Sequence, residues 1–277
     1  TTSSERVDLM NRLSIASHNE KQQSLPLPST FPAKDLALPK EERKTVLLMS
    51  CTSWTPDEDF KVLLDALEKL DQRVTANSTT GGFDFPKVAV VVTGKGPQKS
   101  MYQNKILRMR PSLTNITIDT MWLEASDYPM LLGCADLGIC LHTSTSGRDL
   151  PIKIMDMFGC QVPVCAIQFQ CIEEVMRHGW NGMIFTSSDD LTQQLLDLLG
   201  GERGPLESMR NNIATMARWD EEWNKVANEV IHDVCIIGQK RRFVNGRRFE
   251  VIGKMLLGFA LAAVVVACIF PRFVDFC

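Results

Sequence analysis

The sequence predicts an α/β protein built on a Rossmann-like, doubly wound parallel sheet. Strand-like and helix-like segments alternate from residue 44 to about residue 238. The strand candidates are continuous apolar runs, which are typical of strands buried on both faces. Helix-start signals or helically spaced apolar residues follow most of them, as expected where helices cover both faces of a parallel sheet.

The first strand and helix carry the clearest boundary signals. Residues 46–49 (VLLM) are a short apolar run between polar residues, which predicts a buried strand. Residues 55–58 (TPDE) then supply a hydroxyl cap, a proline at the first helical position and two acids in the first turn. Apolar residues from Phe60 to Leu70 recur at helical spacing, and residues 71–86 are expected to be a polar connection.

The rest of this region follows the same alternation. Further strands are expected at residues 87–93, 116–121, 137–141, 162–167 and 183–185. Helices are expected from about residue 98 to residue 110 and at residues 127–134, 152–158, 189–199, 204–217 and 220–236. A domain over residues 44–238 has an ordinary size for one Rossmann-like unit.

The segments outside this domain differ in composition. Residues 1–43 are polar and carry four prolines, so a partly disordered linker is expected there, with a short helix around residues 7–13. Residues 239–250 are basic, residues 251–270 are apolar with one charge at Lys254, and residues 271–277 form a short tail. Twenty apolar residues make about 30 Å of helix, which matches a bilayer core, so a C-terminal hydrophobic transmembrane helix is expected at 251–270. A buried final helix of the domain is the alternative.

Charge divides the chain in the same way. The whole sequence has a net charge of −3, but seven of its thirty basic residues lie after position 239, where only two acids oppose them. Residues 1–239 are therefore acidic, which argues against nucleic acid as a partner. The basic run before the apolar segment predicts that the globular domain faces the cytosol.

The nine cysteines do not form a metal site by their spacing. They are scattered, mostly among aliphatic residues, and no CxxC motif or Cys/His cluster with zinc-ligand spacing is present in the sequence. Buried free thiols are therefore expected, and neither a metal nor another cofactor is predicted.

Two loops at predicted strand ends are candidate phosphate sites. Gly94-Lys95-Gly96 follows the strand at 87–93, and glycines there permit close approach to a ligand, although a plain tight turn explains them equally well. The hydroxyl-rich residues 142–148 lead into a helix that carries Lys153 and Asp156. Lys153 is a candidate for neutralising a diphosphate and Asp156 for accepting a ribose diol. The alternative is that Asp149 caps this helix and that the other two lie on a solvated face.

Several segments together resemble one enzyme family. They are residues 53–60 (SWTPDEDF), 91–97 (VVTGKGP), 122–129 (WLEASDYP), 135–144 (ADLGICLHTS), 149–160 (DLPIKIMDMFGC) and 218–223 (RWDEEW). In content and order they are similar to the chitobiosyldiphosphodolichol β-mannosyltransferases of the asparagine-linked glycosylation pathway. The resemblance extends from about Lys44 to Trp223.

The resemblance implies the C-terminal, donor-binding half of a GT-B fold. Such enzymes transfer mannose from GDP-mannose to dolichyl-diphosphate-linked chitobiose, forming a β-1,4 bond with inversion. It implies that Gly94, Lys95 and Gly96 border the donor diphosphate and that Trp122 and Leu123 lie near guanine. It also implies that Asp149, Leu150, Pro151 and Lys153 surround the phosphates and the sugar, and that Asp156 takes the ribose.

The same resemblance places the general base and the acceptor surface in an N-terminal domain outside this sequence. His142 is the nearest candidate base within it, and an ordinary structural role is expected for that side chain. The resulting expectation is a donor-binding domain at the endoplasmic reticulum membrane that has little transferase activity alone and works with a separate acceptor domain. Other glycosyltransferases of the pathway are further candidate partners. The alternative is a non-catalytic, membrane-tethered paralogue that binds nucleotide-sugar or other glycosylation enzymes.

Overall fold

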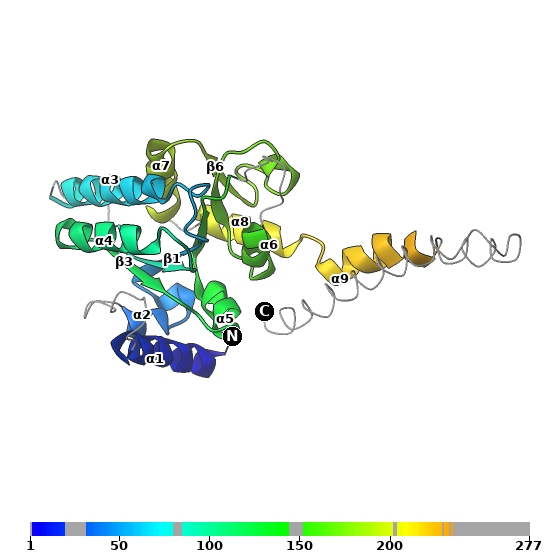
Figure 1. Cartoon of the computed structure of the whole chain (residues 1–277), viewed down its shortest axis with the longest axis horizontal. Coiled ribbons are helices and arrows are strands. Elements are labelled where there is room, and N and C mark those ends of the chain that lie inside the picture. Colours follow the sequence, from blue (N-terminus) through cyan, green and yellow to red (C-terminus); the bar gives the residue numbers. More distant parts are fainter. Residues whose placement is uncertain are drawn as a thin grey trace, which may run out of the picture. The chain divides into compact units, whose positions relative to one another are not determined.

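Six parallel strands form the centre of the protein (Figure 1). A computed structural model describes residues 2–19, 32–79, 85–143, 152–201, 204–228, 230–232 and 234. The strands are β1 (Thr45–Cys51), β2 (Lys87–Thr93), β3 (Ile116–Met121), β4 (Leu137–Cys140), β5 (Val164–Ile167) and β6 (Gly182–Phe185). Their order in the sheet is β3-β2-β1-β4-β5-β6, which confirms the predicted α/β fold with a parallel, doubly wound sheet.

Strand β1 is fully enclosed, because every one of its seven residues is buried. It pairs with β2 from Thr45 opposite Lys87 to Cys51 opposite Thr93, so the two strands end at the same edge of the sheet. Its alternate side chains divide between the two faces, which is why the sequence shows a continuous apolar run rather than an alternating one.

Helices cover both faces of the sheet. The helices whose buried residues share one core cluster are α3 (Phe60–Thr79), α4 (Lys99–Met109), α7 (Ser188–Leu199) and α8 (Gly204–Ala214). The opposite face is covered by α1 (Ser3–Asn19), α2 (Ala33–Leu36), α5 (Asp127–Cys134) and α6 (Ile152–Gly159). Short 3₁₀ helices lie at Lys40–Glu42, Arg110–Ser112 and Ile172–Glu174.

The chain separates into two compact units, Thr1–Ala214 and Thr215–Phe276. The first contains the whole sheet. Within the second, α9 spans Trp219–Glu222 and a π-helical turn follows at Trp223–Ala227. The predicted transmembrane helix at 251–270, the basic segment 239–250 and the tail 271–277 lie outside the described residues. In the part of the chain that the structure does describe, no helix has the length and apolar content needed to cross a bilayer.

Of the first 43 residues, the structure describes 2–19 and 32–43, and the helix expected around residues 7–13 is part of a longer one. Helix α1 occupies Ser3–Asn19 and buries Leu9 and Met10, because these residues and Leu13 fall on one side of the helix. Farther along, the Lys40 ammonium donates to the Ala135 carbonyl over 2.6 Å, and the Arg43 guanidinium donates to the Cys134 carbonyl over 2.7 Å. The described part of this segment is therefore attached to the domain.

Helix α3 is also longer than predicted. It continues through residues 71–79, which were expected to be a polar connection, and Val74 in this stretch is buried. The polar side chain of Asp71 has a tertiary role, since its two oxygens accept the backbone N–H groups of Thr114 (3.0 Å) and Asn115 (2.6 Å). The polar residue Asp71 therefore does not end the helix; its side chain binds the backbone just before β3.

Candidate functional site

The carboxyl ends of β1 and β4 define the place where a doubly wound sheet binds its ligand. From β1 the chain moves outward through β2 and β3, then returns to β1's other side with β4. In doubly wound sheets, ligands bind in the crevice that is expected outside the carboxyl ends of two such strands, at the switch in strand order. Residues 52–59 follow β1, and residues 141–143 follow β4, so both segments lie where this crevice is expected.

A buried carboxylate, Glu58, organises this crevice. Its side chain is 1% exposed and accepts hydrogen bonds from the Thr52 hydroxyl and from the Ser53 backbone N–H (2.7 Å). Its second oxygen forms an ion pair with the ammonium of Lys153 on α6. The Lys153 ammonium also lies 3.4 Å from the Ser53 hydroxyl. The structure thus places the predicted phosphate ligand Lys153 at the end of β1.

The sequence alone does not predict a role for Glu58 in the site. The pattern at residues 55–58 predicts the first turn of a helix, but α3 begins only at Phe60. Glu58 instead folds back onto its own loop, where Thr52 and Ser53 bind it. The signal that could have revealed it is an acid within a loop that follows a buried strand at a predicted ligand edge.

His142 lies beside this ion pair. Its Nδ1 atom is 3.6 Å from an oxygen of Glu58 and 3.6 Å from an oxygen of Asp57, and it is buried without a hydrogen-bond partner among the described residues. The next residue, Thr143, donates its hydroxyl to the Asp57 carbonyl over 2.7 Å. These contacts join the loop after β4 to the loop after β1, and they agree with a structural position for His142.

Gly94 and Gly96 are required by a close contact between two loops of the protein. A Cβ on Gly94 would lie 1.7 Å from the Thr52 carbonyl oxygen, and a Cβ on Gly96 would lie 1.7 Å from the Ser53 carbonyl oxygen. Gly94 also has a φ of +142°, which side chains rarely allow. The two glycines therefore allow the loop after β2 to pack closely against the loop after β1, and their place beside a donor diphosphate stays a prediction.

Lys95, between the two glycines, lies over the ring of Trp122. Its ammonium is 3.8 Å from the ring centroid, a cation–π contact, and Trp122 is 44% exposed. The adjacent Leu123 is buried. The structure therefore brings together two predicted ligand-binding residues from the ends of β2 and β3, and leaves an aromatic surface open to solvent.

Asp156, the predicted ribose acceptor, belongs to a partly buried hydrogen-bonded chain. The Tyr128 hydroxyl donates to Asp156 over 3.2 Å and lies 3.2 Å from the sulfur of Cys51. Burial raises the pKa of the Cys51 thiol to about 12, so the thiol remains protonated and can donate to Tyr128. Burial also raises the pKa of Asp156, whereas the hydrogen bond from Tyr128 lowers it.

Substitution Tyr128→Phe is expected to raise the pKa of Asp156 further. The variant removes the hydrogen bond from Tyr128, which favours the ionised carboxylate, and leaves the burial of Asp156 nearly unchanged. As pH falls, Asp156 should therefore lose its charge at a higher pH than in the original protein. Carbon-detected NMR titration of the Asp156 carboxyl measures this directly. Tyr102→Phe, which changes the other of the two tyrosines, is the matched control, and an Asp156 pKa that stays or falls in Tyr128→Phe would contradict the assignment.

The predicted residues Asp149, Leu150 and Pro151 lie outside the described residues. Among the residues that are described, no cluster of three or more His, Cys, Asp or Glu side chains could hold a metal ion. The described cysteines that are buried, Cys51, Cys134, Cys140 and Cys165, are free thiols.

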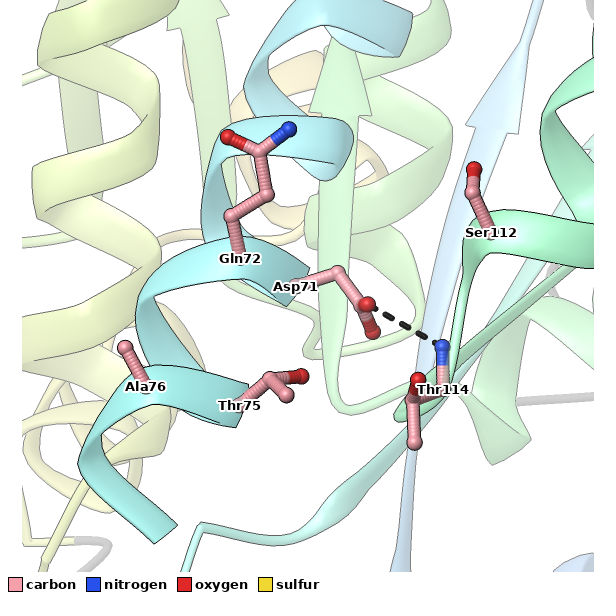
Figure 2. A pocket seen from close by; sticks show the side chains of 6 residues that line it. All are labelled: Asp71, Gln72, Thr75, Ala76, Ser112 and Thr114. Atoms are coloured by element: carbon pink, nitrogen blue, oxygen red, sulfur yellow. Dashed lines mark hydrogen bonds between the residues drawn. The ribbon is translucent and has the colours of Figure 1, made fainter. Parts of the chain in front are cut away.

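A shallow pocket of about 360 Å³ lies at the other end of the sheet (Figure 2). Asp71, Gln72, Thr75 and Ala76 of α3 line one side, opposite Ser112 and Thr114. Figure 2 shows the Asp71 carboxylate bound to the Thr114 backbone N–H across it. Thr114 precedes β3, so this pocket adjoins the amino end of that strand and is separate from the crevice at the carboxyl ends.

Comparison with known proteins identifies the matching family. Residues 43–200 match the family described as "Glycosyl transferases group 1". The chain is 42% identical over 208 residues to the "UDP-glycosyltransferase TURAN" of Arabidopsis thaliana, covering 70% of this chain and 44% of that protein. It is 45% identical over 195 residues to the chitobiosyldiphosphodolichol β-mannosyltransferase of Homo sapiens, covering 69% of this chain and 40% of that protein. The match thus spans less than half of each of these relatives.

Solved structures share the fold. The crystal structure of Anabaena HepE in complex with UDP and glucose superimposes with a TM-score of 0.54 at 18% identity. The match covers 74% of this chain and 53% of that one. The structure of TarM gives a TM-score of 0.50 at 14% identity, over 78% of this chain and 41% of that one. At these identities the likeness shows only that the strands and helices are arranged in the same way.

Proposed function

Because this chain belongs to the group 1 glycosyl transferases, we propose that it binds the nucleotide-sugar donor of a mannosyltransferase in the crevice between β1 and β4. The observation that carries the proposal is the position of Lys153, whose ammonium is held at the carboxyl end of β1 by Glu58 and lies near the Ser53 hydroxyl. A cation fixed at a switch in strand order suits the diphosphate of a nucleotide-sugar.

The donor is proposed to be GDP-mannose. Lys153 would contact the diphosphate, Asp156 would accept the ribose hydroxyls, and the exposed Trp122 ring beside Lys95 would border the guanine. Support comes from the β-mannosyltransferases of human, mouse and orang-utan, each 45% identical to this chain over its matched region. Asp149, Leu150 and Pro151, which follow the loop after β4 in sequence, would complete the sugar subsite.

The proposed reaction is transfer of mannose to dolichyl-diphosphate-linked chitobiose, with inversion to a β-1,4 linkage. An acceptor hydroxyl attacks the anomeric carbon, the bond from that carbon to the phosphate oxygen breaks, and GDP leaves with the bonding electrons. The ammonium of Lys153 would stabilise the negative charge that develops on the leaving phosphate. The acceptor proton would pass to a general base on a separate acceptor domain, supplied in the same polypeptide or by a partner.

The proposed location is the cytosolic face of the endoplasmic reticulum membrane. The apolar residues 251–270 would insert in the bilayer and the basic residues 239–250 would remain on the cytosolic side. Other enzymes of the same pathway are candidate partners at that surface.

Calorimetric titration of the 277-residue chain with GDP, UDP and GDP-mannose tests the donor assignment. We expect GDP and GDP-mannose to bind at least about tenfold more tightly than UDP, a difference of about 1.4 kcal/mol. Preference for UDP would overturn the GDP-mannose assignment and leave a different nucleotide-sugar as donor. Absence of binding by all three would overturn the donor site.

A transfer assay separates the enzyme from the non-catalytic alternative. The chain alone is expected to transfer little mannose to dolichyl-diphosphate-linked chitobiose, because the general base is proposed to lie on another domain. Adding that domain, taken from the human relative, should restore transfer. Strong transfer by the chain alone would contradict this division, and no transfer with the added domain would favour the non-catalytic, membrane-tethered alternative.

A further inference from the structure

Glu58 presents an electrostatic contradiction if the crevice binds a diphosphate. A carboxylate that is 1% exposed lies beside the cation that is proposed to receive the phosphates, and a negative charge there repels an anionic ligand. Asp57 adds a second acid, 3.6 Å from His142. The electrostatic effect alone predicts that Glu58 weakens diphosphate binding.

The hydrogen bonds of Glu58 indicate the opposite effect. One carboxylate oxygen is fixed by its own loop, through the Thr52 hydroxyl and the Ser53 N–H, and the other forms the ion pair with Lys153. A lysine ammonium is carried on a flexible four-carbon chain, and holding it in one position costs conformational entropy. Glu58 provides this restraint before a ligand arrives.

Lys153 retains a donor for that ligand. An ammonium has three N–H groups. One meets Glu58, a second faces the Ser53 hydroxyl at 3.4 Å, and the described residues supply no acceptor for the third. The side chain is 24% exposed, so an anion in the crevice can reach it.

We propose that Glu58 is a positioning residue, which holds the Lys153 ammonium at the end of β1 in the place where it meets the diphosphate of the donor. This inference rests on the proposed donor site. Glu58 raises the affinity for the diphosphate by holding Lys153 in place. This gain exceeds the loss of affinity that is caused by repulsion between the Glu58 carboxylate and the diphosphate.

The direction in which Glu58→Gln changes the affinity for a diphosphate distinguishes positioning of Lys153 from simple repulsion. The full chain and its Glu58→Gln variant are titrated with GDP and GMP, or with UDP and UMP if the original protein prefers UDP. We expect Glu58→Gln to weaken diphosphate binding about tenfold, the equivalent of one charge-assisted hydrogen bond, and to change monophosphate binding much less. Tighter diphosphate binding by the variant, or no change, would overturn the proposal.

A double-mutant cycle tests whether Glu58 acts through Lys153. In a Lys153→Met background, Glu58→Gln should no longer weaken diphosphate binding and should strengthen it, because only repulsion remains to be removed. The same tenfold loss in both backgrounds would overturn the inference. Glu207→Gln, which removes an exposed acid on α8, is the control for net charge.

A shorter carboxylate provides a second test in case Glu58→Gln fails to fold. Glu58→Asp keeps the charge but withdraws it by one methylene, so it should also weaken diphosphate binding, whereas simple repulsion predicts little change. If the original protein binds neither GDP nor UDP, the proposed function and this inference fall together. If it binds GDP and neither Glu58 variant lowers the affinity, this inference alone is overturned.

Discussion

Substitution Gly96→Ala is expected to lower the free energy of unfolding by about 3 kcal/mol, the upper end of the range for overpacking. The added Cβ would lie 1.7 Å from the Ser53 carbonyl oxygen and 3.0 Å from the Trp54 Cβ. Neither neighbour can move freely, since the Trp54 carbonyl accepts the Gln98 N–H over 3.0 Å and Trp54 is buried. Urea denaturation followed by circular dichroism measures the loss.

The same loops carry the proposed donor site, so Gly96→Ala should also weaken GDP binding. The clash pushes the loop after β2 away from Ser53, whose hydroxyl lies beside the Lys153 ammonium. Gly133→Ala is the matched control, because a Cβ there meets no atom within 4 Å and Gly133 lies in helix α5. The control should be neutral or slightly stabilising, since alanine favours a helix over glycine by about 0.5–1 kcal/mol. Equal stability of the two variants would contradict the loop contact.

Substitution Trp54→Ala is expected to destabilise the fold by about 3 kcal/mol. Trp54 is 1% exposed, and its ring lies 4.7 Å from that of Phe60 and 5.9 Å from that of Tyr102, measured between centroids. Removing a large buried ring leaves a cavity that costs about 3–5 kcal/mol. The lower end applies here because the indole N–H is buried without a partner among the described residues, and the substitution removes that unsatisfied group as well.

Trp122→Ala is the control with the same chemical change on the surface. Trp122 is 44% exposed, so the loss should be limited to about 1 kcal/mol, most of it the cation–π contact with Lys95. Comparable losses of stability in Trp54→Ala and Trp122→Ala would refute the buried aromatic cluster. Loss of GDP binding in Trp122→Ala with an unchanged fold would support its proposed place beside guanine.

The sequence was sufficient to predict the sheet. Its buried strands are apolar runs such as residues 87–93, and burial on both faces leaves little freedom for other residues there. Alternation with helices then predicts parallel pairing, and the carboxyl edge follows from it. Local composition was misleading where polar residues serve tertiary contacts, as Asp71 does when it binds the backbone before β3.

The segment before residue 44 is a second place where local composition only partly predicts the structure. Its prolines and polar residues predict a linker with a short helix around residues 7–13, whereas α1 spans Ser3–Asn19 and buries Leu9 and Met10. A helix with a narrow apolar stripe gains its stability from packing against its neighbours rather than from its own composition. All four prolines of this segment lie after Asn19, so none of them interrupts the helix.

The sequence by itself thus determined the fold class, the edge of the sheet where a ligand is proposed to bind, and several residues at that edge, among them Lys153, Asp156 and Trp122. Only the tertiary structure decided what these residues contact. Glu58 joins Lys153, a residue 95 positions away, Tyr128 joins Asp156 across 28 positions, and the two glycines face the backbone of another loop. Hydrophobic periodicity is a local property that can be read directly from the sequence, whereas these contacts depend on which strand ends meet in the folded sheet.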